Sequence, residues 1–142
     1  MEYILLKEKA IKYIGISKKT EFEVRKKLKN VSTDEELINK VIEYLKELGY
    51  IDDIDYVKSY IRQNINMLKY SKYELKQKLL QKGIKASIIE EKFETDLPED
   101  YERRVIEKLT HGKLKNYEDI KRKEYLYRKG FRFDNLGEMY EE

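Results

Sequence analysis

A short basic stretch with the pattern of an amphipathic helix occurs three times in this chain and constrains its fold more than any other feature. The copies are offset by about 51 and 47 residues and run from Thr20 to Leu28, from Ser71 to Leu79 and from Glu118 to Leu126. One helical unit of this size cannot bury its apolar face alone, so repetition at this spacing is typical of proteins that stack similar helical units. The pattern predicts an extended surface built from several units in place of one deep pocket.

Helix-start and helix-stop signals divide the chain into nine expected helices in three groups of three. A hydroxyl followed three residues later by Glu, the capping-box pattern, opens two of the basic stretches at Thr20 and Ser71. The alternation of apolar and polar residues that β-strands need is absent. Glycine followed by an apolar residue, a typical helix stop, occurs at Gly15, Gly49, Gly83 and Gly130.

We therefore expect an all-α fold of three tandem three-helix repeats that form an elongated, curved array. The expected units span residues 1–52, 53–97 and 98–142. The first helix is expected to cover residues 2–14 and the ninth residues 132–140. Further helix starts are expected at Thr33, Asp53, Ser87 and Pro98, and at Asn116 or Glu118.

Each middle helix carries a second apolar side chain on the face opposite its core residues. These side chains are Phe22, Tyr73 and Ile120. Either the next repeat or a partner protein would explain them, and we favour the next repeat.

Charge is segregated along the chain, although the net charge of +3 is small. Residues 17–29, 71–85 and 117–132 contain 6, 5 and 6 Lys or Arg against 2, 1 and 3 acids. The stretches between them are acidic, with 8 acids against 2 Lys in residues 33–55 and 7 against 1 in residues 87–102. A solvated surface does not need this segregation, so it favours a basic surface with a function.

The chain has no cysteine and no apolar run of the roughly 20 residues that a membrane span needs. We therefore expect a cytoplasmic protein that makes no contact with membrane. No phosphate loop, nucleophile–base pair or metal-ligand spacing is present in the sequence. The sequence favours a binding protein over an enzyme, and we expect no cofactor.

Two features could still indicate catalysis. Asp52, Asp53 and Asp55 could hold Mg²⁺, but a turn with a helix N-cap is the simpler interpretation. His111, the single histidine, lies in a polar segment at a helix end, which favours a surface or capping role.

The segment Leu48-Gly-Tyr-Ile-Asp-Asp53, followed by Tyr56-Val57 and Tyr60-Ile61-Arg62, resembles the signature of the RecX family of bacterial recombinase regulators. Residues 74–84 and 128–131 resemble the corresponding elements of the second and third repeats. The resemblance extends from about residue 10 to residue 140. It implies three tandem three-helix repeats that bind the RecA–DNA filament, lie in its groove, and suppress recombinase and coprotease activities.

Cations of the middle helices and their ends are the candidate partner-binding residues. They could contact an acidic protein groove, DNA phosphates or both, or they could pair with acids of neighbouring helices on an ordinary solvated face. The ten candidates are Arg25, Lys26, Arg62, Lys76, Lys78, Lys82, Arg122, Arg128, Lys129 and Arg132.

The resemblance favours a monomer that acts as a clamp on a RecA filament assembled on single-stranded DNA, with a role in recombination, DNA repair and the SOS response. An alternative is a module resembling helix-turn-helix elements that binds DNA phosphates directly, without RecA. A third hypothesis is a scaffold for an unrelated protein, and the sequence supplies no residue that would distinguish this hypothesis from the other two.

Overall fold

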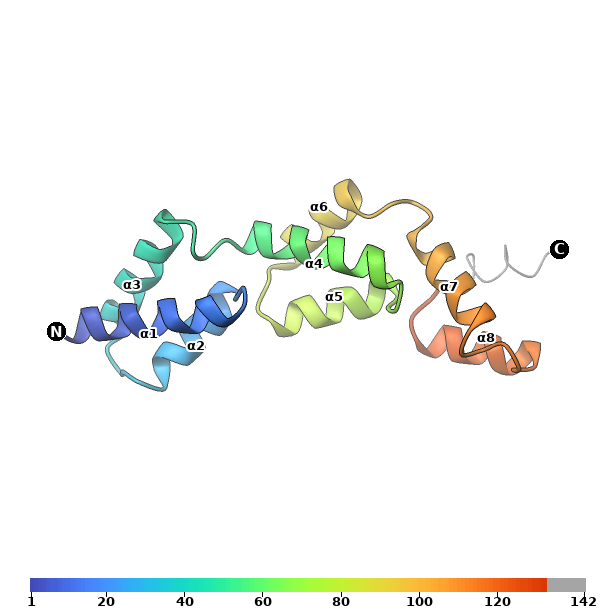
Figure 1. The fold of residues 1–142 in the computed structure, drawn as a ribbon, viewed down its shortest axis with the longest axis horizontal. Helices are drawn as coiled ribbons and strands as arrows, with labels where there is room; N and C mark the ends of the chain where they lie inside the picture. Colours follow the sequence, from blue (N-terminus) through green and yellow to red (C-terminus); the bar gives the residue numbers. More distant parts are fainter. Residues whose placement is uncertain (133–142) are drawn as a thin grey trace.

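The computed structural model describes residues 1–132, which form eight α-helices and no β-strand. Figure 1 shows the helices along one elongated path, with α1 and α8 at opposite ends. The prediction of an all-helical array of three-helix repeats is confirmed. The helices are α1 (Glu2–Ile16), α2 (Glu21–Lys29), α3 (Glu35–Glu47), α4 (Asp53–Met67), α5 (Lys72–Gln81), α6 (Ala86–Asp96), α7 (Tyr101–His111) and α8 (Asp119–Arg128).

We call α1–α3 the first unit, α4–α6 the second, and α7 with α8 the described part of the third. The expected ninth helix lies, beyond its first residue, outside the described residues. The first unit has its own apolar core, which includes Leu6, Val24 and Ile42. The second and third units share one core, in which Tyr101 and Phe131 are buried. Apolar packing therefore joins these two units more closely than it joins the first unit to the second.

The helix ends that depend on capping boxes and positive-φ glycines are predicted correctly. Thr20 and Ser71 both form complete capping boxes at the starts of α2 and α5. Gly49, Gly83 and Gly130 end α3, α5 and α8 with φ between 79° and 105°, a region that favours glycine.

Five expected helix ends are wrong. Gly15 does not end α1, because glycine is tolerated inside a helix at a cost of about 1 kcal/mol, and α1 continues to Ile16. Asp34 caps α3 in place of Thr33, because its carboxylate accepts the Leu37 amide at 3.1 Å.

The helix α4 is capped by Asp52 in place of Asp53, whose carboxylate bonds to the first unit. The helix α6 begins at Ala86, one residue before the expected cap at Ser87, and has no side-chain cap. Glu118 is confirmed as the residue before α8. The expected start at Pro98 is wrong, because α7 begins at Tyr101 and Pro98 lies in the turn before it.

The first joint connects the first and second units through the start of α2 and the end of α5. The buried Thr20 hydroxyl accepts the Glu23 amide within its own helix and donates to the Lys82 carbonyl of the next unit at 2.6 Å. The Glu23 carboxylate lies 3.7 Å from the Lys82 ammonium. The first amide of α2, that of Glu21, donates to Asp53 at 2.9 Å. Two units are thus joined by the groups that also cap their helices.

The second joint repeats this arrangement between the second and third units. The buried Ser71 hydroxyl donates to the Lys129 carbonyl at 2.7 Å, and the Lys129 ammonium lies 3.1 Å from Glu74. The first amide of α5, that of Lys72, donates to Glu102 at 3.3 Å. Equivalent atoms therefore make equivalent bonds at both joints, so the two neighbouring pairs of units are held in the same way.

Aromatic side chains explain why each joint requires glycine. A Cβ atom on Gly83 would lie 2.2 Å from the Phe22 side chain, and one on Gly130 would lie 2.8 Å from that of Tyr73. Phe22 and Tyr73, the second apolar side chains of α2 and α5, therefore pack on the next unit, which is the alternative that we favoured from the sequence. Ile120, the third such side chain, is 72% exposed.

Substituting alanine at Gly83 should destabilise the protein through both backbone strain and displacement of Phe22. We expect a loss of about 3 kcal/mol in the free energy of unfolding, measured by urea denaturation followed by circular dichroism. Gly49→Ala shares the positive φ but has no atom within 4 Å of the added Cβ, so it should cost less. Gly15→Ala, in a helix, should stabilise by about 0.5–1 kcal/mol. Equal losses for Gly83→Ala and Gly49→Ala would contradict the packing argument.

Replacing Thr20 by valine keeps the side-chain shape and removes its hydroxyl. The substitution should cost about 1–3 kcal/mol, because the helix loses its cap and the buried Lys82 carbonyl loses its donor. The matched control is Thr33→Val, since Thr33 is exposed and should change the stability by less than about 0.5 kcal/mol. A comparable effect of the two substitutions in the same denaturation experiment would show that the joint hydroxyl is unimportant.

Candidate partner-binding surface

Two adjoining hollows form a groove that crosses the first joint, which we call the lysine–tyrosine groove. The first hollow, of about 410 Å³, lies between the end of α1, the outer side of α2 and the end of α5. The second, of about 370 Å³, lies between α4 and α5. Gln81 and Lys82 line both hollows, so the two hollows adjoin at the end of α5, where the first and second units meet. Its cationic lining residues are Lys26, Lys27, Lys78 and Lys82.

Tyrosine rings lie beneath several of these cations. The Lys27 ammonium lies 5.3 Å from the centroid of the Tyr13 ring, and the Lys78 ammonium lies 4.5 Å from that of Tyr70. A cation over an aromatic face is attracted by its quadrupole, which holds the ammonium in place while leaving it accessible. The groove therefore presents positive charge on a surface of rings, which suits an anionic partner.

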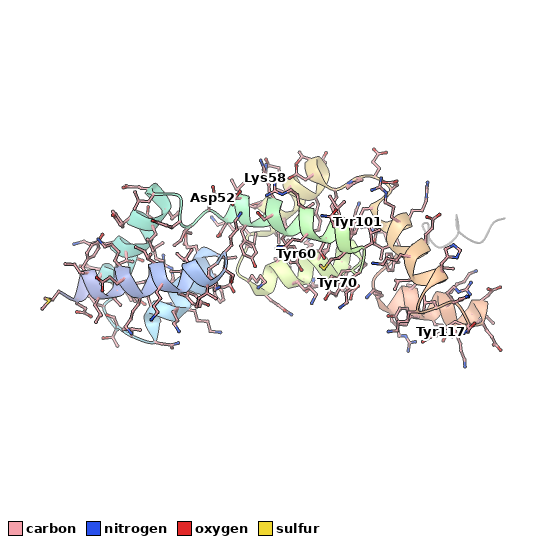
Figure 2. All side chains as sticks on the ribbon, in the orientation of Figure 1. Asp52, Lys58, Tyr60, Tyr70, Tyr101 and Tyr117 are labelled. Carbon is pink, nitrogen blue, oxygen red and sulfur yellow. The ribbon has the colours of Figure 1, made fainter. Side chains whose placement is uncertain are left out.

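Tyr60 and Tyr70 line the same hollow of the groove (Figure 2). Burial raises the pKa of Tyr60 to about 12, and the neighbouring Tyr70 and Tyr56 hydroxyls add to the shift. The Tyr60 hydroxyl is therefore neutral at physiological pH and does not offset the charge of the lysines.

Three of the predicted cations bind groups within their own unit. Arg25 bonds to Asn39 of α3, Lys76 lies 2.9 Å from Glu90 of α6, and Arg122 donates to two backbone carbonyls of the third unit. For these three residues, pairing with groups of the protein itself on an ordinary solvated face fits better than a role in binding a partner.

Lys82 and Lys129 serve the joints, although Lys82 also lines the groove. Burial opposes the charge of Lys82, but a hydrogen bond to Tyr56 and the charge of Glu23 outweigh it and raise the pKa of Lys82 above its ordinary value. The side chain of Lys129 is only 14% exposed. Lys82 therefore remains charged, and Lys129 contributes little accessible surface.

The remaining candidates are exposed but lie apart. Arg62 on α4 bonds to Ser59, and Arg128 ends α8. Arg132 lines a separate hollow at the second joint, together with Lys76. The structure thus brings Lys26, Lys78 and Lys82 together in one groove and does not bring the ten cations into one stripe.

Sequence reasoning omitted Lys27, Tyr13 and Tyr70 from the candidates, although they complete the groove. Lys27 follows Lys26 in the basic stretch, so its charge was visible. The pairing of Lys27 with a tyrosine of α1, and of Lys78 with a tyrosine of the turn before α5, depends on tertiary packing and left no local signal.

The acidic cluster has a structural role, as the simpler interpretation proposed. Asp52 caps α4, Asp53 accepts the Glu21 amide, and Asp55 lies 2.6 Å from Lys18. Burial raises the pKa of Asp53, whereas the hydrogen bond from Lys18 lowers that of Asp55. Over residues 1–132, no group of three His, Cys, Asp or Glu could hold a metal ion, and no helix is long and apolar enough to cross a membrane.

Models of two RecX domains match this chain. Residues 7–45 match the first three-helix domain of RecX, and residues 52–92 match the second. These ranges coincide with most of the first unit and most of the second.

Relatives and solved structures agree with these matches. The protein is 32% identical to "Regulatory protein RecX" of Clostridium acetobutylicum over 99% of this chain and 69% of the relative. It is 40% identical to that of Streptococcus agalactiae over 68% of this chain, although the match spans only 38% of the relative.

The crystal structure of RecX from Lactobacillus salivarius superposes with a TM-score of 0.83 at 25% identity, over 97% of this chain and 94% of that one. A second structure, of regulatory protein RecX, gives a TM-score of 0.81 at 28% identity, over 97% of this chain and 70% of that one. With two domain models, relatives along the whole chain and the same arrangement of helices, the chain belongs to the RecX family of regulatory proteins.

Proposed function

We propose that this protein binds the RecA filament on single-stranded DNA and restrains its recombinase, ATPase and coprotease activities. Its place among the RecX regulators supports a regulatory role. The observation that carries the proposal further is the lysine–tyrosine groove, whose two adjoining hollows are lined by residues of the first and second units. A groove that crosses units suits a partner that is itself a polymer.

The joints support a clamp mechanism. Because both joints use the same buried hydrogen bond and the same ion pair, the units hold a defined spacing. An array that contacts neighbouring filament subunits would favour the filament state that matches this spacing. Such differential contact slows any step, including ATP turnover, that requires the other state.

Direct DNA binding without RecA is the second candidate function. Positive side chains interleaved with aromatic rings are typical of surfaces that bind single strands, and the groove has both. This alternative predicts that the protein binds single-stranded DNA in the absence of RecA. The logarithm of the binding constant should then fall by about 0.7 for each phosphate contact when the logarithm of the salt concentration rises by one. Comparing DNA affinity with and without RecA separates the two functions.

We further propose that the protein is a cytoplasmic monomer whose units divide near residues 52 and 97. Within residues 1–132, the outer faces of the first and third units lack the groups that form the joints, which supports a single chain. Asn30 and Val31 stand at the end of α2, where the joints have lysine and glycine, and Glu118 stands at the start of α8 in place of a hydroxyl. A second copy would therefore find no matching joint at either end.

Reversing the charge of two groove lysines should weaken the action on RecA. We expect the wild-type protein to slow ATP hydrolysis by RecA on single-stranded DNA. With Lys26→Glu and Lys78→Glu combined, about tenfold more protein should be needed for the same effect, because rim charges steer and hold an anionic partner. Helicity and thermal unfolding should be nearly unchanged.

The matched control combines Lys9→Glu and Lys40→Glu, which are exposed and change the net charge equally outside the groove. This control should act like the wild type. If the two double variants lose activity to the same extent, net charge and not the groove determines binding. If the wild-type protein has no effect at stoichiometric amounts, the RecA proposal itself is wrong.

A further inference from the structure

A hollow of about 460 Å³ lies at the second joint, between α5, α6, the start of α7 and the turn that follows α8, whereas the lysine–tyrosine groove crosses the first joint. We call it the second-joint hollow. Its aromatic lining comes from Tyr73, which is 58% exposed, and from Phe93. The charged side chains that line it are Lys72, Lys76, Arg132 and Glu102.

Only two of these four charges are available to a ligand. The Glu102 carboxylate accepts the Lys72 backbone amide, and the Lys76 ammonium lies 2.9 Å from Glu90. The side chains of Lys72 and Arg132 are exposed and make no hydrogen bond or ion pair with any residue of the described range 1–132. The hollow therefore holds two accessible cations beside an aromatic wall.

The first joint has an equivalent hollow, of about 450 Å³, in which the signs differ. Glu21 stands there in place of Lys72, and its carboxylate lies 2.9 Å from Lys46. The joint forms with either residue, because the bond that it needs comes from the backbone amide at that position. The architecture of the repeat therefore does not require a lysine here.

Helix electrostatics also disfavour a lysine at residue 72. It is the first residue of α5, and a cation in the first turn is opposed by the positive end of the helix dipole. The nearby backbone amides of Lys72 and Glu74 are already bonded to side chains, so they do not attract an anion in its place. An interaction outside the chain would account for a cation at this position.

We propose that the second-joint hollow binds a protein segment that carries one acidic side chain next to an aromatic or aliphatic one. The carboxylate would lie between Lys72 and Arg132, whose planar guanidinium suits paired hydrogen bonds, while the apolar neighbour packs on Tyr73 and Phe93. Identification of the segment with a surface of RecA rests on the proposed function, whereas the chemistry of the hollow does not.

The surroundings favour such a segment over a nucleic-acid strand. The helix α6, which supplies Phe93, also carries four acids, so negative charge that repels a phosphate backbone lies on the helix beside the hollow: Glu90, Glu91, Glu94 and Asp96. One inserted carboxylate avoids this repulsion.

The test uses the full-length ¹⁵N-labelled protein and two capped peptides, Gly-Glu-Phe-Gly and its Gln counterpart, titrated into the millimolar range. The Glu peptide should shift the amide signals of Lys72, Tyr73 and Gly130, and added salt should weaken the effect. The Gln peptide should bind about five- to tenfold more weakly, because it lacks the charge. Equal binding of both peptides, or binding of neither, overturns the proposal. Stronger shifts of the same amides by oligothymidylate would identify a nucleic-acid site instead.

The variant Lys72→Glu with Arg132→Glu should lose the peptide-induced shifts and fold normally, because glutamate stands at the position of the first joint equivalent to Lys72, and Arg132 is exposed. The pair Lys9→Glu and Lys40→Glu, with the same change in net charge, should retain them. Retained shifts in the first variant would contradict the proposal. Because no RecA is present, this result is independent of the ATPase experiment, so either proposal can fail without the other.

Discussion

A buried hydroxyl at the start of α2, and its equivalent at the start of α5, make the interaction on which the array depends. Each accepts an amide of its own helix and donates to the last carbonyl of the next middle helix, so one oxygen satisfies groups from two units. Such buried groups are costly when left unpaired. Capping a helix and joining two units therefore become one event, which ties the fold of each unit to the position of its neighbour.

The joints also create the surfaces that could bind a partner. Where two units meet, their helices leave hollows on different sides of the middle helices, lined by residues from both units. The bonds that hold a joint come from backbone groups, short polar side chains and one ion pair. The neighbouring positions are free to vary, as the glutamate of the first joint and the lysine of the second illustrate. One architecture thus carries surfaces of different charge.

The two joints differ in their apolar content. The second and third units share one core through Tyr101 and Phe131, whereas the first unit closes its own core. Polar contacts and the packing of Phe22 on Gly83 hold the first unit to the rest. The lysine–tyrosine groove crosses this more polar joint, so a ligand that fills the groove would also fix the first two units relative to each other.

The sequence by itself determined the helical class, the repeat and the ends formed by Thr20, Ser71 and the positive-φ glycines, because these depend on contacts within a few residues. It misplaced the caps at Asp34 and Asp52, since adjacent polar residues compete and only the path of the chain selects one. It could not sort the ten cations, because the partner of Lys78 is a tyrosine of the turn before its helix and those of Lys82 and Lys129 belong to another unit. Only the tertiary structure decided which lysines hold the joints and which face solvent. The sequence shows which residues carry charge, but the distances between those charges are set by packing.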